Sequence, residues 1–461
     1  MEMILTNVVA VVNDILWNKY LVLLFLLLGS GVFFTVRTNF VQVRKFREGM
    51  RLVFGNLTLN GKAAGKDGMS SFQALATAIA AQVGTGNIAG CASALVSGGP
   101  GAVFWMWVSA FFGMATIYGE AVLAQKYKDV GEDGTVSGGP IYYIKAAFKG
   151  KLGSFLAGFF AVAIILALGF MGNMVQSNSI GDAFYTAFGV PKLAVGIAVA
   201  AVSAFIFLGG VKRIAAITEK LVPVMAIFYI CGSLIAIGMN AENILPALKS
   251  VFVGAFTPQA VMGGAIGISI KEAVRFGVAR GLFSNEAGMG STPHAHAMAK
   301  VEKPQDQGAV AMIGVFIDTF IVLTMTALVI LTSGMLGTTG ADGQMLTATA
   351  LAQAAFNNSF GAFGSVFVAI CLLFFAFSTI IGWYFFGESN VKALFKGSKK
   401  ATAIYGVIAL VFIVVGSFQK VGLVWDMSDM FNGLMVIPNL LAVLALSGVI
   451  AKFAKDDDFR G

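Results

Sequence analysis

The chain has 461 residues, of which 57% are hydrophobic and only 12% are charged, and its mean hydropathy is +0.84. A typical soluble domain carries roughly 25% charged residues, so this composition excludes a soluble globular protein and predicts a polytopic membrane protein. The net charge is +8, but the lysines and arginines lie in loops between apolar runs and form no basic face, which argues against a nucleic-acid partner.

Apolar runs divide the chain into about eleven predicted spans, because a helix needs about 20 apolar residues to cross a bilayer. The first run, 15–36, follows no basic region and is long enough to span, so we expect a retained helix rather than a cleaved signal peptide. The three cysteines lie in separate apolar runs without metal-binding spacing, which indicates packing residues. The spans start near residues 15, 70, 100, 153, 190, 213, 258, 306, 360, 401 and 428.

The distribution of basic residues predicts the orientation of these spans. With the N-terminus outside, 27 of the 31 lysines and arginines fall on the cytoplasmic side, a count that includes Lys271, Arg275 and Arg280 of the seventh span. This bias predicts an odd number of spans, with the N-terminus outside and the C-terminus inside. We therefore expect a multi-pass protein in the plasma membrane of a prokaryote, in contact with lipid.

The second span is interrupted by the segment QVGTGN, residues 82–87. Two glycines, a threonine and uncharged amides suit a continuous helix in lipid poorly, because each unpaired backbone group there costs several kcal/mol. Many secondary transporters bind their substrate at such a broken helix, so we predict a discontinuous second span. A simple glycine kink, or a packing seam through Gly86 and Gly90, is the alternative.

The seventh span, 262–300, is also irregular, and we place its break at the glycine cluster 263–267. The two broken spans are then five apart, and this odd offset predicts two halves that lie in the membrane with opposite orientation. The predicted divisions are 1–69, an extra peripheral helix with a basic cytoplasmic loop; 70–240, the first five-helix repeat; 250–453, the second, inverted repeat; and 454–461, a cytoplasmic tail.

Four stretches of the sequence are distinctive: GGPGAVFWMW (98–107), QVGTGNIAG (82–90), SNEAGMGSTPHAHA (284–297) and FSTIIGW (377–383). They resemble segments of the alanine or glycine:cation symporter family, and the resemblance covers essentially the whole chain. It implies a sodium-coupled importer of alanine and glycine with an all-α, LeuT-type fold of five plus five helices, within the amino acid–polyamine–organocation superfamily. Composition and periodicity by themselves indicate only an inverted-repeat transporter.

A zwitterionic amino acid needs N–H groups for its carboxylate and carbonyl oxygens for its ammonium, and the ends of half-helices offer both. We expect the N–H groups of Gly84, Thr85 and Gly86 to bind the carboxylate, with Gln82 and the carbonyls before the break near the ammonium. Interhelical hydrogen bonds and ordinary aromatic packing are the alternative roles for the polar and aromatic residues of the other helices. From those helices we expect substrate contacts by Phe170, Met171, Asn173 and Gln176 on the fourth span, Gly263, Gly264, Ile266 and Gly267 on the seventh, and Phe374 and Trp383 on the ninth.

The resemblance also implies a sodium site, by similarity to the cation site shared by this fold. Its ligands would be the hydroxyls of Ser378 and Thr379 together with backbone carbonyls near Ala80, Val83 and Phe375. Such a site needs no carboxylate. Adjacent hydroxyls in an apolar helix also commonly bond to their own i−4 carbonyls, which is the alternative.

Charged residues of the seventh span, namely Glu272, Arg275, Arg280 and Glu286, are predicted to form a cytoplasmic gate, with a solvated helix face as the alternative. Carboxylates inside a membrane are functional candidates by default, and the sequence places Glu120 in the third span and Asp318 in the eighth. A proton-coupled symporter would depend on one of these carboxylates, whereas a sodium mechanism would depend on the two hydroxyls of the ninth span.

Other function classes are less compatible with the sequence. A membrane-embedded enzyme would need a nucleophile–base pair or a metal set inside the spans, and neither HExxH nor GxSxG occurs. The only histidines, His294 and His296, point apart on a helix and have no evident third ligand. A channel would conduct without coupling, whereas two broken helices favour alternating access. We expect no requirement for an oligomer.

Overall fold

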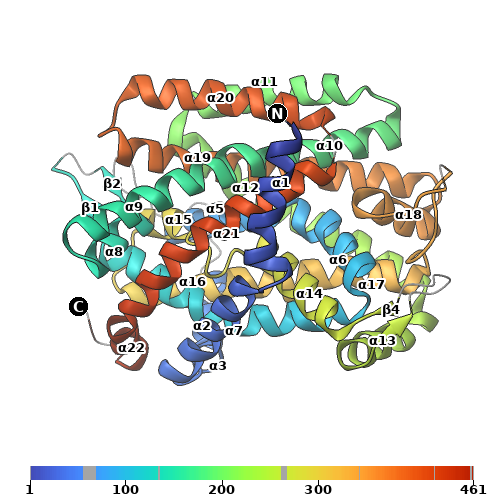
Figure 1. The fold of residues 1–461 in the computed structure, drawn as a ribbon, viewed down its shortest axis with the longest axis horizontal. Helices are drawn as coiled ribbons and strands as arrows, with labels where there is room; N and C mark the ends of the chain where they lie inside the picture. Colours follow the sequence, from blue (N-terminus) through green and yellow to red (C-terminus); the bar gives the residue numbers. More distant parts are fainter. Residues whose placement is uncertain are drawn as a thin grey trace.

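The computed structural model describes residues 2–55, 69–132, 135–260, 267–341, 343–419, 421–456 and 459. Within these residues the fold is helical apart from two short antiparallel hairpins, in which Asp129 pairs with Ser137 and Gln259 with Ile268. The long helices α7, α19 and α20 run along the bundle, horizontally in Figure 1. The first hairpin, α8 and α22 lie at one end of the bundle, and α13, α18 and β4 lie at the other.

The N-terminal helices and the first half of the bundle account for residues up to 256. Their bounds are α1 (Glu2–Asn13), η1 (Asp14–Asn18), α2 (Val22–Arg37), α3 (Val41–Arg44), α4 (Phe46–Phe54), α5 (Ser71–Gln82), η2 (Gly86–Gly90), α6 (Cys91–Gly98), α7 (Gly101–Lys126), β1 (Asp129–Val130), β2 (Val136–Ser137), α8 (Pro140–Ala147), α9 (Gly150–Ile164), η3 (Ile165–Gly172), α10 (Asn173–Phe188), α11 (Lys192–Phe207), α12 (Gly210–Met239), η4 (Ala241–Asn243) and α13 (Ile244–Phe256).

The second half of the bundle follows the second hairpin. Its elements are β3 (Gln259–Ala260), β4 (Gly267–Ile268), α14 (Ile270–Asn285), α15 (Pro293–Met298), α16 (Pro304–Val315), η5 (Phe316–Leu323), α17 (Thr324–Ser333), α18 (Ala348–Phe360), α19 (Phe363–Leu394), α20 (Lys399–Phe418), α21 (Val421–Ala445) and α22 (Ser447–Lys455).

Eight helices of the described chain are long and apolar enough to cross a membrane, and the bent pair formed by α5 and η2–α6 makes nine. The second predicted span is therefore broken, with its two parts inclined at 46°. The other two of the eleven predicted spans correspond to the shorter apolar helix α11 and to the α14–α15 pair. The count of eleven and the orientation stay predictions.

The two broken spans begin in the same way. Ser70 caps α5 and Ser269 caps α14, each by accepting a hydrogen bond from the backbone N–H three residues later. The side chains of Gln73 and Glu272 complete the two capping boxes by accepting from the backbone of the capping serines. These caps start each helix well before its break, so both breaks lie deep inside the bundle.

The second break lies elsewhere than predicted. Gly267 belongs to the hairpin strand β4 and precedes α14, while Gly263, Gly264 and Ile266 lie outside the described residues. Helix α14 instead ends at Asn285 and is followed by Glu286, a residue in left-handed conformation with φ 58°; α15 begins at Pro293. Gly267 is thus separated from the break by the whole length of α14, about 24 Å for its 16 residues.

The course of α14 also corrects the charge count. A Cβ atom on Gly98, at the end of α6, would lie 3.2 Å from the carbonyl of Glu272, so α14 starts beside that end. Met69, which precedes α5, pairs instead with Ala299 after α15. In the predicted orientation, Lys271, Arg275 and Arg280 therefore move to the extracellular half. The cytoplasmic share falls from 27 to 24 of the 31 basic residues, and the bias keeps its direction.

Candidate functional site

The break in the second span leaves two carbonyl groups without their helical donors. In a continuous helix the N–H of Gly84 would donate to the carbonyl of Ala80, but here it donates to Asn87 Oδ1 at 2.9 Å. The N–H of Asn87 donates to the carbonyl of Gly84 rather than to that of Val83. The carbonyls of Ala80 and Val83 are thereby released from the helix ladder at the C-terminal end of α5, where the helix dipole favours a cation.

Two hydroxyls of α19 face these released carbonyls. Thr379 Oγ1 lies 2.9 Å from the carbonyl oxygen of Ala80, 3.4 Å from that of Val83 and 3.0 Å from that of Phe375. Ser378 Oγ lies 3.3 Å from the Ala80 oxygen and 2.8 Å from the Phe375 oxygen. All five residues are at most 1% exposed. The structure thus brings together five oxygen atoms, all uncharged, from the residues predicted to bind sodium.

Helix α10 contributes an amide to the same junction. Gln176 Oε1 accepts a hydrogen bond from the backbone N–H of Thr85 at 3.0 Å. A Cβ atom on Gly84 would lie 3.0 Å from this oxygen and only 2.4 Å from Thr379 Oγ1, so this position requires glycine. The break, the α19 hydroxyls and Gln176 therefore meet at one point.

Buried polar atoms without partners occur at the end of α5, at the break and at the start of α10. Thr85 Oγ1, Gln82 Oε1 and Asn173 Oδ1 have no hydrogen-bond partner among the described residues. Such atoms are rare in proteins and call for a ligand, an ion or water. The Asn173 amide donates only to the carbonyl of Gly169 on its own helix, which leaves its oxygen available.

The remaining predicted residues of the fourth span are placed less centrally. Phe170 stacks on Phe412 at 4.9 Å and lies 5.6 Å from Tyr405, so its ring packs against α20. Met171 is half-buried and, like Phe170, packs against the apolar cluster that contains Tyr405. Ordinary packing therefore accounts for Phe170, which sequence reasoning could not separate from a substrate contact.

The second break faces the first. Gln82 Nε2, at the end of α5, donates to the carbonyl of Asn285, the last residue of α14, at 2.7 Å. A Cβ atom on Gly86 would lie 3.1 Å from the ring of Phe283 and 3.2 Å from Ser284 Cα. The end of α14, residues 283–285, therefore lies against the first break.

Glu120 of α7 holds the second break in place. Its carboxylate accepts hydrogen bonds from the N–H groups of Gly288 and Gly290, each at 3.0 Å, and from Asn439 Nδ2 at 2.6 Å. Both glycines have positive φ, 86° and 78°, so their N–H groups point out of any helical ladder. This fully buried carboxylate thus supplies acceptors that the break itself lacks.

One wall of the junction is built from aromatic rings. Trp383 is 1% exposed, donates its indole N–H to Glu286, and packs edge-on against Phe283 with ring centroids 5.8 Å apart. Phe374, which was predicted to line the same space, packs against a different apolar cluster that contains Val83 and Ile88. The two aromatic residues of α19 therefore do not form one wall.

The four residues predicted to form a cytoplasmic gate do not form one network. Glu272 caps its own helix, and Glu286 lies at the break with Trp383 and Ser291. Arg280 makes two 2.8 Å hydrogen bonds to the carboxylate of Asp429 in α21. These contacts place the ion pair of Arg280 and Asp429 between α14 and α21, on the side of the break away from Ala299.

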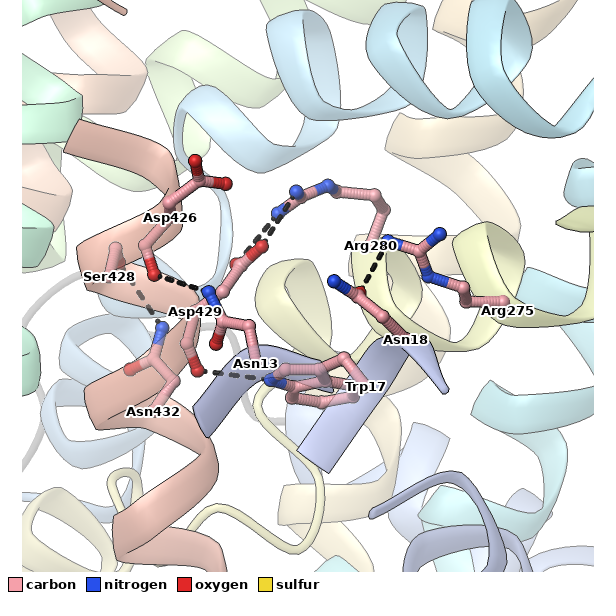
Figure 2. A network of polar contacts seen from close by, with 9 residues as sticks. All are labelled: Asn13, Trp17, Asn18, Arg275, Arg280, Asp426, Ser428, Asp429 and Asn432. Atoms are coloured by element: carbon pink, nitrogen blue, oxygen red, sulfur yellow. Dashed lines mark hydrogen bonds and ion pairs between the residues drawn. The ribbon is translucent and has the colours of Figure 1, made fainter. Parts of the chain in front are cut away.

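The extra N-terminal span makes hydrogen bonds to α21 and α14 beside this ion pair (Figure 2). Asn13 Nδ2 and Trp17 Nε1 donate to the backbone carbonyls of Asp426 and Asp429 at 2.9 and 3.0 Å. Asn18 accepts a hydrogen bond from Arg275. The first span, which the sequence predicted to be peripheral, therefore contacts both α14 and α21 beside this ion pair.

Two aromatic rings extend from this ion pair toward the second break. The guanidinium of Arg280 lies 4.6 Å from the ring of Trp425, which packs on Phe283 at 4.8 Å. Arg280 and Asp429 are only 13% and 20% exposed, so this side of the junction is covered by a largely desolvated ion pair over stacked rings. Cation–π contacts of this kind add to the ion pair.

A cavity of about 640 Å³ opens on the other side. His294 and Asn390 line it, joined by a 2.8 Å hydrogen bond, and lysines of α12 and α19 lie farther out. His294 belongs to α15, directly after the second break. The ion pair of Arg280 thus covers one side of the junction, while the cavity lies beyond the second break, and none of the residues that line it belongs to the junction.

Several important side chains were missed or undervalued in the sequence. Asn87 lies inside the distinctive stretch 82–90, yet only the structure reveals it as the cap of Gly84. Asp429 is an acidic residue in an apolar run, a signal that could have identified it. Its partner Arg280 is 149 residues away, and no sequence spacing connects them.

The chain is similar along its length to known transporters. The model of the sodium:alanine symporter family matches residues 1–459. The sodium/alanine symporter AgcS of Methanococcus maripaludis is 42% identical over 450 residues, which cover 97% of this chain and 96% of that protein. The probable sodium/glutamine symporter GlnT of Bacillus subtilis is 42% identical, covering 99% and 91%. The amino-acid carrier protein AlsT of the same organism is 41% identical, covering 99% and 93%.

Solved structures support the fold. MhsT, in a complex with L-phenylalanine, superposes with a TM-score of 0.57 at 14% identity, covering 85% of this chain and 98% of that protein. A mutant manganese transporter of Eremococcus coleocola gives a TM-score of 0.50 at 18% identity, covering 87% and 82%. These likenesses confirm the predicted LeuT-type helical membrane fold.

These relationships also confirm that the chain is a transporter and not an enzyme, as the sequence predicted. Its bacterial and archaeal relatives and its apolar helices indicate a multi-pass protein of the plasma membrane. The chain belongs to the sodium:alanine symporter family.

Proposed function

We propose that this protein imports small neutral amino acids, alanine and glycine, by alternating access, and that each substrate molecule enters with sodium bound between α5 and α19. The related AgcS is named a sodium/alanine symporter, and AlsT an amino-acid carrier. GlnT is named a probable glutamine symporter, so the family name does not decide the substrate by itself. The size of the binding space must therefore decide between alanine and glutamine as the substrate.

The observation that carries the proposal is the oxygen cluster around Thr379. A sodium ion prefers hard oxygen ligands, and the carbonyls of Ala80 and Val83 have lost their helical donors. Without an ion, the hydroxyls of α19 can do no more than donate to nearby carbonyls, as helical serines and threonines commonly do. An ion at this point would bind α5 to α19 and would stabilise the break beside it.

The adjoining backbone supports a site for the amino-acid zwitterion. The N–H groups of Gly84 and Thr85 donate to Asn87 and Gln176, both uncharged acceptors that a carboxylate could replace with stronger, charge-assisted hydrogen bonds. Asn173, three residues before Gln176 on α10, keeps a buried side-chain oxygen without a hydrogen-bond partner among the described residues. We propose that the carboxylate binds the N–H groups at the break and that the ammonium faces the Asn173 oxygen.

The aromatic wall supports a small side chain. A Cβ atom on Gly172 would lie 2.5 Å from the indole of Trp383, so this indole is already pressed against η3. Glu286 fixes its orientation from the other side. With Phe283 across from it, the space suits the methyl group of alanine or the hydrogen of glycine better than a large side chain.

The two sides of the junction support alternating access. The ion pair of Arg280 and Asp429 covers one side, and the cavity lined by His294 lies beyond the second break on the other. In the orientation predicted from basic residues, the ion pair lies on the extracellular side of the break and the cavity lies on the cytoplasmic side. We retain 70–240 and 250–453 as the proposed inverted repeats, with the second break moved to 286–292.

Reconstitution into liposomes tests the proposal. Labelled alanine should accumulate when sodium is high outside and should accumulate little under a proton gradient alone. Glycine should compete with alanine, and glutamine should compete weakly. Accumulation driven by protons without sodium would favour the alternative of a proton-coupled symporter and would contradict the proposed coupling.

A further inference from the structure

A pocket of about 730 Å³ lies where two spanning helices end on the same side of the bundle. Arg37 is the last residue of the span Thr6–Arg37, Ala445 is the last residue of the span Val424–Ala445, and both line the pocket. The apolar part of a spanning helix ends at the edge of the hydrocarbon core. The pocket therefore lies at the depth of the lipid headgroups.

Helix α22 presents two lysines to this pocket. Gly448, Lys452 and Lys455 are spaced i, i+4 and i+7, so they share one face of the helix, and all three line the pocket. Ile450 and Phe453 lie on the opposite face and are both 0% exposed. The helix is thus amphipathic, with its charged face turned toward the pocket.

Contacts with the bundle fix the position of α22, which packs against α2 and α7 (Figure 1). Arg44 Nη2 donates a hydrogen bond to the carbonyl of Ala454 at 2.7 Å. A Cβ atom on Gly119 of α7 would lie 2.8 Å from Ile450 Cδ1, so these two helices are in close contact. The two lysines are therefore carried by a packed helix and not by a loose tail.

The charges that line the pocket are mainly positive. Arg37, Lys452 and Lys455 are exposed, and none of them makes a hydrogen bond or an ion pair with another described residue. Asp456 is the one carboxylate among the described lining residues, so three cations stand against one anion. A ligand with a negative charge would therefore meet complementary charge here and could form charge-assisted hydrogen bonds.

Apolar side chains lead from the pocket into the hydrocarbon region. Phe33 and Val36, which precede Arg37 on α2, are 42% and 63% exposed, and Leu441, one turn before Ala445 on α21, is 41% exposed. Exposed apolar side chains on a spanning helix face the acyl chains of lipids. A ligand with an anionic head and apolar chains matches this whole surface, whereas a free anion matches only its charged part.

We propose that the three cations of this pocket bind the phosphate of an anionic phospholipid, whose acyl chains lie along Val36 and Leu441. Basic clusters at the ends of spanning helices bind such headgroups, and each lysine or arginine near the membrane surface adds about fivefold in affinity. In the predicted orientation the pocket faces the cytoplasmic leaflet. This lipid site goes beyond the proposed transport function, because none of its lining residues belongs to the junction of the broken spans.

The test is equilibrium binding of a fluorescently tagged phosphatidylglycerol to the purified full chain in uncharged detergent micelles. The wild type should bind it at least about tenfold more tightly than a phosphatidylcholine with the same tag and chains. Arg37→Gln should weaken phosphatidylglycerol binding about fivefold, and Lys452→Gln combined with Lys455→Gln should weaken it roughly 25-fold.

A matched control removes the same charge elsewhere. Lys149→Gln combined with Lys151→Gln changes two exposed lysines that do not line the pocket, and it should change phosphatidylglycerol binding less than about threefold. Thermal melting checks that every variant is folded, and we expect no change because all five substituted residues are exposed.

Two results would overturn the inference. Equal binding of the two lipids by the wild type, or equal losses in the two double variants, would show that the attraction belongs to the whole basic surface. Glycerol 3-phosphate that competes as strongly as untagged phosphatidylglycerol would assign the pocket to a soluble anion instead of a lipid. Neither measurement involves alanine or sodium, so failure of the proposed transport function would leave this test unchanged.

Discussion

Arg280 and Asp429 form a bidentate ion pair that joins α14 to α21, with both hydrogen bonds at 2.8 Å. The pair is largely buried, and Trp425 lies directly against the guanidinium. The N-terminal span holds the same part of α21 through Trp17. The two ends of the junction are therefore unequal: one is covered by charge and aromatic rings, and at the other a cavity lies beyond the second break.

Breaking this ion pair should favour the state that is open at its side. Asp429→Asn leaves Arg280 without its counter-charge, and we expect it to slow net alanine uptake at least tenfold while increasing the access of a thiol reagent to a cysteine placed at Ser109. Arg280→Asp combined with Asp429→Arg should restore part of the uptake. Arg275→Gln, which loses the Asn18 hydrogen bond and the contact with the Phe276 ring but keeps the pair of Arg280 and Asp429, is the control and should have a smaller effect. Equal losses of alanine uptake in Asp429→Asn and Arg275→Gln would contradict this role of the ion pair.

Gly84 should tolerate no side chain. A Cβ atom there would lie 2.4 Å from Thr379 Oγ1, inside the proposed ion site, so Gly84→Ala should reduce sodium-dependent uptake at least a hundredfold. Gly90→Ala is a matched control, since its Cβ would make only ordinary contact with Trp425 at 3.6 Å. Initial uptake rates in liposomes compare them. Comparable losses in the two variants would favour a glycine packing seam over a binding site.

The position of Trp383 should set the size of the substrate. Gly172→Ala would push a methyl group to within 2.5 Å of the indole, so we expect it to abolish alanine uptake and to affect glycine uptake less. Gly158→Ala, where no atom lies within 4 Å of the new Cβ, should behave like the wild type. Competition assays with both amino acids measure the difference. Unchanged alanine uptake in Gly172→Ala would show that the indole does not bound the pocket.

Glu120 should contribute mainly to stability. Glu120→Gln replaces one acceptor by an amide donor that faces backbone N–H groups, and it should destabilise the protein by about 2 kcal/mol. A fall in the melting temperature of purified protein reports this loss. Glu242→Gln, an exposed change at η4, should leave the melting temperature unaltered. A normal melting temperature with lost sodium-driven alanine uptake would instead show that Glu120 acts directly in transport.

The break at Gly84 could be predicted because glycine and threonine interrupt an apolar run in a way that lipid does not tolerate. The break at Glu286 could not, since it depends on a left-handed non-glycine residue whose carboxylate is buried against Trp383. A glutamate in that position resembles a surface gate residue. The glycine cluster at 263–267 drew the prediction instead, although the described part of it belongs to a hairpin.

The ion site illustrates a different limit. Ser378 and Thr379 were visible as hydroxyls in an apolar span, but carbonyl ligands carry no residue signature, and Ala80, Val83 and Phe375 were reached only through the family resemblance. Their geometry depends on contacts between residues about 300 positions apart, such as Thr379 with Ala80. Only the folded structure brings these atoms together.

The sodium dependence of alanine uptake by Thr379→Ala tests the central claim most directly. Removing this hydroxyl deletes the one side chain that approaches all three carbonyls of the proposed site. The sodium concentration for half-maximal uptake should rise at least tenfold, about 1.4 kcal/mol of lost binding. Cys371→Ala, a buried change two turns before Ser378 on the same helix, removes no oxygen ligand and should leave it within about twofold of the wild type. An unchanged sodium dependence in Thr379→Ala, with normal folding, would contradict the account.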